Sequence, residues 1–115
     1  MEIKAEDYRN QIDEVLKKHG LSAANLDLVD DFGGEARVTK CFKIQKKIYI
    51  KKVITGQERE WTISGLHQFE EDKIKLLNDD WTFLKHMILR EICRILYRYK
   101  DDYECAKWAF YELKG

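Results

Sequence analysis

The sequence of 115 residues contains no proline. Proline averages about 5% of residues in proteins and is a strong marker of linkers and of helix boundaries. Low-complexity tracts and internal repeats are missing as well, so neither a flexible tether nor a repeat array is indicated. We therefore expect a single domain over residues 1–115, which is enough chain to enclose a hydrophobic core.

Cysteine is scarce, with three residues and no CxxC pair: Cys41, Cys93 and Cys105. An odd number of cysteines without a CxxC motif argues against the disulfide framework of small secreted domains. No apolar run is long enough to cross a bilayer, and no signal-peptide pattern opens the chain. Together these features predict a cytoplasmic protein with free thiols and no membrane partner.

Motifs of catalysis and cofactor binding are also missing, including the P-loop, the dinucleotide fingerprint and the nucleophile elbow. The histidines are far apart in the sequence, at His19, His67 and His86. Four acids precede the basic segment: Asp27, Asp30, Asp31 and Glu35. They lack the alternating spacing of an EF-hand loop, which favours a solvated loop over a metal site. We expect no catalytic residue, no cofactor, no metal and no enzymatic activity.

The most informative absence is that of acidic residues from positions 36–57. This basic segment carries seven cationic residues: Arg37, Lys40, Lys43, Lys46, Lys47, Lys51 and Lys52. The chain as a whole has zero formal net charge, so the excess of positive charge is confined to this segment. Concentrated positive charge attracts anions and acidic surfaces. A general nucleic-acid coat protein is usually basic overall, and this chain is not.

Apolar periodicity predicts helices at both ends of the chain. The first is predicted over about 5–19 and ends at Gly20, a favourable residue just beyond a helix C-terminus. Others are predicted over about 66–77 and 81–99. A last helix is predicted after Asp101, which forms a capping box with Glu104.

Between these helices, alternating hydrophobicity predicts an antiparallel β-meander over about 37–44, 48–55 and 58–63. A brief edge strand is expected near Leu26 and Leu28. A short loop would place Ile44 opposite Ile48 and turn Phe42 toward the apolar face. The predicted class is α+β: an N-terminal helix, a three- or four-stranded antiparallel meander, and two or three C-terminal helices packed on one sheet face.

Two groups of residues are candidates for partner binding. The predicted solvent face and tip of the hairpin carry Arg37, Lys43, Lys46, Lys47, Tyr49 and Lys51. On the long helix, His86, Arg90, Arg94 and Arg98 recur every four residues and should line one side. Arginine binds carboxylate and phosphate through two parallel hydrogen bonds, which lysine does not. The alternative is that both groups are ordinary solvated faces, since lysine also protects strand edges from aggregation.

Two further features concern single residues and the aromatic content. Cys41 lies on the predicted basic face, where neighbouring lysines would lower the pKa of its thiol. Aromatic residues crowd the last third of the chain, at Trp81, Tyr97, Tyr99, Tyr103, Trp108, Phe110 and Tyr111. The helices cannot bury all of them, and exposed Trp and Tyr beside Arg are typical of interface hot spots.

The sequence thus predicts a non-catalytic binding module that uses the basic hairpin and the Arg-lined helix. The expected partner is a protein with an acidic or a nucleic-acid-binding surface. Direct RNA or DNA binding through the same face is one alternative, and a small enzyme or thiol-redox protein is another. In composition the chain resembles single-domain accessory proteins, including toxin-immunity proteins and phage-encoded inhibitors. Its oligomeric state is left open.

Overall fold

The computed structural model describes residues 2–114 and has the α+β class predicted from the sequence. The helices in this part of the chain are α1 (Arg9–Lys18), α2 (Gly56–Ser64), α3 (Glu71–Lys75), α4 (Asp80–Leu96) and α5 (Asp102–Glu112). The strands are β1 (Ile3–Lys4), β2 (Leu26–Val29), β3 (Thr39–Phe42), β4 (Lys47–Lys51) and β5 (Val53–Ile54). Short 3-10 turns lie at Ala5–Tyr8, Ala23–Asn25 and Leu76–Asn78.

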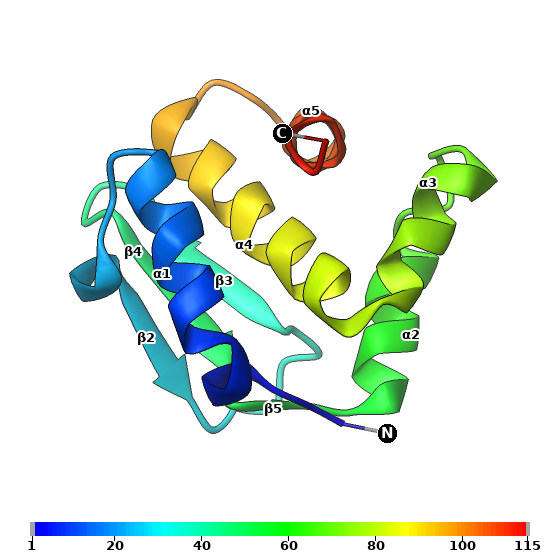
Figure 1. Ribbon diagram of the computed structural model, residues 1–115, viewed down its shortest axis with the longest axis horizontal. Coiled ribbons are helices and arrows are strands. Elements are labelled where there is room, and N and C mark those ends of the chain that lie inside the picture. The colour runs from blue at the N-terminus through cyan, green and yellow to red at the C-terminus, as the bar shows by residue number, and fades with distance from the viewer. Residues whose placement is uncertain (1, 115) are drawn as a thin grey trace.

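The larger sheet has the strand order β2-β4-β3, with β4 in the centre (Figure 1). β3 and β4 form the predicted antiparallel hairpin, but β2 pairs with β4 in parallel. β1 and β5 form a separate antiparallel pair in which Ile3 lies opposite Ile54. The predicted all-antiparallel meander is therefore wrong.

The third strand predicted for the meander, 58–63, is the helix α2 instead. A capping box begins this helix. The Thr55 hydroxyl accepts from the Glu58 amide at 3.1 Å, and the Glu58 carboxylate accepts from the Thr55 amide at 2.9 Å. This Thr-x-x-Glu signal outweighs the short alternation of Trp61 and Ile63, because it satisfies two amides that a helix start otherwise leaves unpaired.

The register of the hairpin also differs from the prediction. Cys41 lies opposite Ile48, three residues from the predicted partner Ile44. A shift by an odd number of residues turns the other face of β3 toward the core. The connecting loop spans 43–46, and Lys46 takes a left-handed conformation with φ 54°. As a result Thr39 is buried, while Phe42 is 43% and Ile44 81% exposed.

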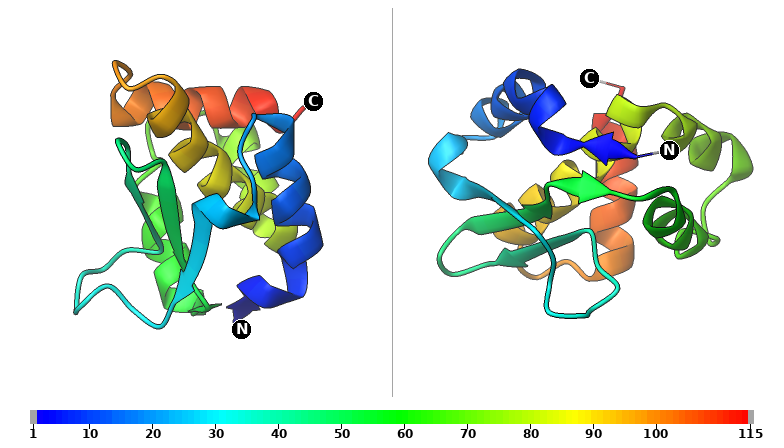
Figure 2. Two further views of the ribbon diagram at one scale, coloured as in Figure 1. Left: turned by 90° about the vertical axis from the view of Figure 1, so that its left-hand side faces the viewer. Right: turned by 90° about the horizontal axis from the view of Figure 1, so that it is seen from below.

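Helices α1 and α4 lie over one face of the three-stranded sheet (Figure 1). The opposite face of the sheet is at the edge of the molecule (Figure 2). The core fills the layer between sheet and helices with fully buried aliphatic side chains, among them Ile12, Leu16, Ile48, Ile50, Leu84, Ile88 and Ile92. Helix α5, seen end-on in Figure 1, packs against α4 rather than against the sheet.

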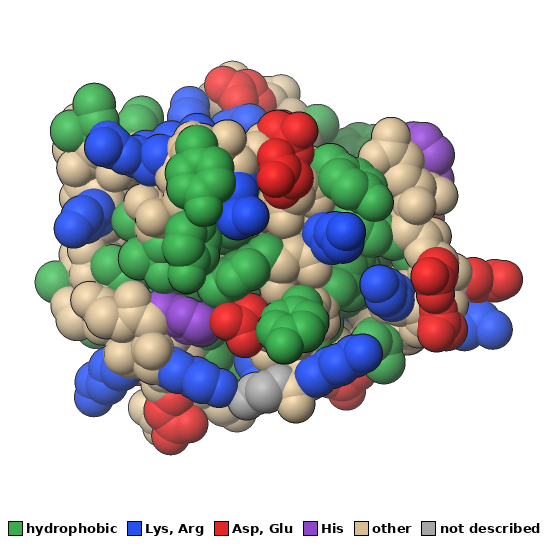
Figure 3. Space-filling model, turned by 90° about the horizontal axis from the view of Figure 1, so that it is seen from above, with side chains coloured by type: hydrophobic (Ala, Val, Ile, Leu, Met, Phe, Trp, Pro, Cys, Tyr) green, Lys and Arg blue, Asp and Glu red, His purple; other side chains and the backbone are tan. Residues whose placement is uncertain are grey.

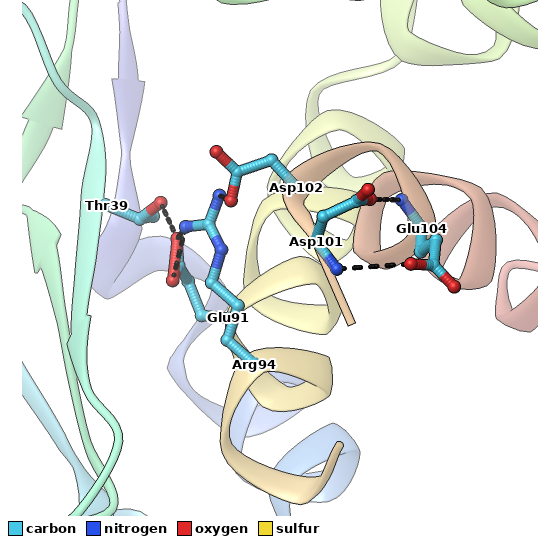
Figure 4. Close-up of polar contacts among 6 residues, drawn as sticks. All are labelled: Thr39, Glu91, Arg94, Asp101, Asp102 and Glu104. Carbon is cyan, nitrogen blue, oxygen red and sulfur yellow. Dashed lines mark hydrogen bonds and ion pairs between the residues drawn. The ribbon is translucent and has the colours of Figure 1, made fainter. Parts of the chain in front are cut away.

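The C-terminal helices depart from their predicted ranges in two places. The helix predicted over 81–99 is α4, which ends at Leu96, so Arg98 lies in the turn that follows it. The helix predicted over 66–77 is reduced to α3 and a 3-10 turn, because 65–70 form turns. The predicted capping box of α5 is present: Asp101 Oδ1 accepts from the Glu104 amide at 2.8 Å, and Glu104 Oε1 accepts from the Asp101 amide at 3.3 Å (Figure 4).

Candidate functional site

Most of the basic segment is neutralised by carboxylates of the same molecule. The ion pairs are Arg37–Glu35 (3.3 Å), Lys40–Glu35 (3.9 Å), Lys47–Asp27 (3.1 Å), Lys51–Glu58 (2.5 Å) and Lys52–Asp30 (3.2 Å). The acids that precede the segment therefore face it in space, and the parallel pairing of β2 with β4 brings Asp27 beside it. The Lys51–Glu58 pair is partly buried. The other pairs are more exposed and contribute little stability, but together the pairs cancel much of the local field.

Within residues 2–114, Lys43 and Lys46 are the two bases of this segment for which the structure shows no ion pair. Both are exposed in the hairpin loop. Two hydrogen bonds join this loop to the 3-10 turn at Ala23–Asn25. Asn25 Nδ2 donates to the Lys46 carbonyl at 2.8 Å, and Lys47 Nζ donates to the Ala24 carbonyl at 2.9 Å. The two free cations are thus displayed on an anchored loop.

Two arginines of α4, and Arg98 in the turn after this helix, line hollows beside the edge strand β3. Arg90 lines a pocket with residues 36–39, at the start of the strand. Arg98 lines a shallow depression with residues 41–45, at the hairpin loop. Arg94 is on the same helix as Arg90 and lines the same pocket, whereas Arg98 follows the end of α4 at Leu96. The hairpin and the arginine stripe therefore share one side of the molecule, which the sequence could not establish.

Arg94 is part of a buried polar network (Figure 4). Glu91, which is 0% exposed, accepts from Thr39 Oγ1 at 2.9 Å and from Arg94 Nη1 at 2.6 Å. Arg94 Nη2 also donates to Asp102 at 2.8 Å, which ties α4 to the start of α5. Burial lowers the pKa of Arg94, but the two carboxylates outweigh burial and leave it raised. Arg94 is thus a structural ion-pair partner that joins β3, α4 and α5.

The remaining candidate surface is at the tip of the hairpin. We call it the tip surface and define it by Phe42, Lys43, Ile44, Lys46 and Arg98. Two of its members are exposed apolar side chains, and the other three are cations that form no ion pair among residues 2–114. The ring of Phe42 is steadied by an edge contact with Tyr49 at 5.5 Å between ring centroids and by the Lys40 ammonium at 5.6 Å. Sequence reasoning placed Phe42 and Ile44 in the core because it set the loop one residue too short.

His86 does not belong to the exposed stripe predicted from its spacing. Its side chain is 0% exposed and packs 4.1 Å from the ring of Phe110, measured between centroids. Nε2 donates to the Ala106 carbonyl at 3.2 Å. Burial, with a further contribution from the Arg90 guanidinium, lowers the pKa of His86 to about 4. The imidazole is therefore neutral at physiological pH and fills the α4–α5 contact.

The prediction of an activated thiol at Cys41 is wrong. The corrected register turns this residue toward α4 and leaves it half-buried. Burial and the neighbouring Glu91 carboxylate raise the pKa of the Cys41 thiol to about 12, and Arg94 and Lys43 only partly offset this. A thiol with so high a pKa is a poor nucleophile at neutral pH.

Aromatic side chains also reach the surface at the C-terminal end of the chain. Figure 3 shows hydrophobic side chains interleaved with Lys and Arg on the face that contains α5. Tyr99 is 81%, Tyr103 44% and Tyr111 73% exposed, and Lys100 lies 5.5 Å from the centroid of the Tyr99 ring. This face carries acids as well, including Glu104, so its charge is mixed.

The described residues show no group of three or more His, Cys, Asp or Glu side chains that could hold a metal ion. Within the same part of the chain, no helix combines the length and apolarity needed to span a bilayer. No protein-family model, curated protein or solved structure matches the chain.

Proposed function

We propose that the protein is a non-catalytic binding module whose tip surface contacts an acidic surface on a protein partner. The observation that carries this proposal is Ile44, an aliphatic side chain that is 81% exposed and lines a shallow depression together with the cations Lys43 and Arg98. Phe42, which is 43% exposed, adds a second apolar side chain to this surface, and exposed apolar patches rimmed by polar groups mark contact sites. Complete burial of such a side chain in an interface is worth about 1.5–3 kcal/mol.

The cations around Ile44 supply direction and speed rather than most of the affinity. Complementary charge steers encounter and rejects basic partners. Among the described residues, Lys43, Lys46 and Arg98 form no ion pair. A partner therefore does not have to displace an internal carboxylate from them. The two hydrogen bonds at the base of the loop reduce the ordering cost of binding.

A protein partner is preferred to RNA or DNA for two reasons. Ile44 offers neither a stacking surface nor a hydrogen bond to a base, whereas nucleic-acid sites rely on aromatic stacking and on phosphate contacts. On the outer sheet face, Lys47 and Lys51 are already paired with carboxylates, and Tyr49 packs against Phe42. A phosphate backbone would have to compete with those pairs.

A domain of this size that acts by contact alone would occlude or tether its partner. We therefore propose an accessory or inhibitor-type role in the cytoplasm, of the kind that immunity proteins and phage-encoded inhibitors perform. Free thiols and a neutral overall charge are compatible with that setting.

The test is affinity capture from host lysate with wild-type protein, an Ile44→Ser variant and a Lys43→Glu variant. Tyr111→Ser is the matched control, because Tyr111 is 73% exposed on α5 and lies outside the tip surface. The same partner should be retained by wild type and by the control, and lost by both tip variants.

Salt and nuclease treatment separate the two partner classes. Protein binding with an apolar centre should survive nuclease and change little with salt. Nucleic-acid binding would instead fall by a factor of up to about 10³ between about 50 and 200 mM salt. If the Ile44→Ser variant retained the partner as well as wild type does, the proposed role of the tip surface would be contradicted, whether the partner is a protein or a nucleic acid.

A further inference from the structure

A second site lies at the other end of the seam between β3 and α4. A pocket of about 240 Å³ opens between the start of β3, helix α2 and helix α4. An ordered water needs only about 10–15 Å³, so the pocket has room for a larger ligand. Three of its lining residues are arginines, Arg37, Arg90 and Arg94, and no acid lines it within the described part of the chain. The charged side chains that line this pocket are thus all positive.

Arg90 distinguishes this pocket from an ordinary ion-pair network. Its Nε atom is buried and has no hydrogen-bond partner. The structure shows no ion pair for its guanidinium among residues 2–114, because the adjacent Glu91 is occupied by Arg94 and Thr39. Burial lowers the pKa of Arg90, and the guanidiniums of Arg94 and Arg37 act in the same direction, while Glu91 and Asp102 oppose them.

Arg90 as a whole is half-buried, but a buried guanidinium nitrogen without a hydrogen-bond partner is costly to a folded protein and calls for a functional or structural explanation. The other two arginines meet their carboxylates outside the pocket. Arg37 Nε lies 3.3 Å from Glu35, and Arg94 binds Glu91 and Asp102. A ligand with several acceptor oxygens would satisfy Arg90 and could share the remaining donors of its neighbours.

We propose that this pocket binds a phosphate group, carried either by inorganic phosphate or by a small phosphomonoester. Guanidinium groups donate in a planar fork that matches the oxygens of phosphate. A dianion with three or four acceptor oxygens fits a pocket lined by three guanidiniums better than a single carboxylate does. Trp61, which is 54% exposed, lines the same pocket and can contact the organic part of an ester.

The site is distinct from the tip surface and does not depend on the proposed function. Arg90 is on α4, whereas Arg98 lies in the turn after this helix and lines the depression at the hairpin loop. A failure of phosphate binding would leave the protein-binding proposal intact. Arg98 in turn provides a control of identical chemistry outside the pocket, in the turn that follows α4.

The experiment follows the arginine Nε–H resonances by NMR while the protein is titrated with inorganic phosphate, phenyl phosphate, acetate or chloride at constant ionic strength. The variants are Arg90→Met and Arg98→Met. Phosphate should move the Arg90 Nε–H signal saturably, and acetate and chloride should not. A hydrogen bond to a charged group is worth about 1.5–3 kcal/mol, so Arg90→Met should weaken phosphate binding by about tenfold or more. Arg98→Met should leave it unchanged within about twofold.

The ligands separate the two sources of the phosphate group. Tighter binding of phenyl phosphate would identify an ester, and equal or weaker binding would identify the free ion. The proposal is overturned by the absence of a saturable shift with either phosphate in the wild-type protein. An equal response to acetate would overturn it too, and so would equal weakening by Arg90→Met and Arg98→Met. The wild-type titration decides the question even if Arg90→Met does not fold.

Discussion

The buried imidazole of His86 predicts a specific loss of stability in mild acid. In the folded protein burial lowers the pKa of His86 to about 4, whereas an exposed histidine titrates near 6.5. Between these pH values the unfolded chain binds a proton that the folded protein does not, so the free energy of unfolding falls as the pH falls. A pKa unit corresponds to about 1.4 kcal/mol. The full loss is therefore about 3 kcal/mol, beginning near pH 6.5 and complete below about pH 4.

The assay is urea unfolding of wild type and His86→Gln at about pH 7 and about pH 4.5. Glutamine keeps a donor for the Ala106 carbonyl but does not titrate. The carboxylates and His19 are present in both proteins. Burial also lowers the pKa of His19, and this shift is common to wild type and variant. Their contribution cancels in the comparison, and wild type should lose about 2–3 kcal/mol more than the variant over this interval.

Equal losses in the two proteins, within about 0.5 kcal/mol, would refute the reasoning, since that is the usual error of additivity between variants. Such a result would mean that His86 is protonated in the folded protein or is accessible to water. Direct titration of the His86 ring signals by NMR would then show a pKa near the ordinary value instead of the lowered one.

Three further predictions follow from the polar contacts around α4. Glu91→Gln removes the buried partner of Arg94 and should cost about 3 kcal/mol in urea unfolding, near the lower limit for broken buried pairs because Asp102 remains; a loss below about 1 kcal/mol would contradict this. Asp101→Ala removes the cap of α5 and should cost about 1 kcal/mol, with an unchanged midpoint as the contrary result. Cys41 should react with iodoacetamide at about pH 8 two to three orders of magnitude more slowly in the folded than in the unfolded protein, as its thiolate fraction requires; comparable rates would contradict the raised pKa.

Sequence reasoning identified the class, the helices α1, α4 and α5, and the cap at Asp101. Helical periodicity and capping are local signals that a single segment carries in full. The parallel partner of β2 and the two-stranded pair of β1 and β5 depend on contacts between distant segments, and no local pattern encodes them. The strand predicted at 58–63 failed because the four-residue capping box from Thr55 to Glu58 was interpreted as the end of a strand followed by a two-residue turn.

The site was predictable in part. Helical spacing predicted one stripe of Arg90, Arg94 and Arg98, but α4 ends at Leu96, so Arg98 lies in the turn beyond the helix. The spacing also could not distinguish the roles of three identical residues. Arg94 is held by Glu91, Arg90 faces a pocket and Arg98 is exposed. The exposure of Ile44 was missed because loop length decides the register, and one odd shift reverses the faces of a strand.

The most direct test of the tip surface is a hydrogen-exchange footprint on the complex with the captured partner. The account predicts slowed amide exchange at 42–46 and at 97–99, with little change along the outer sheet face at 49–51. Protection confined to the exposed aromatic face of α5, with the hairpin loop exchanging as fast as in the free protein, would contradict it.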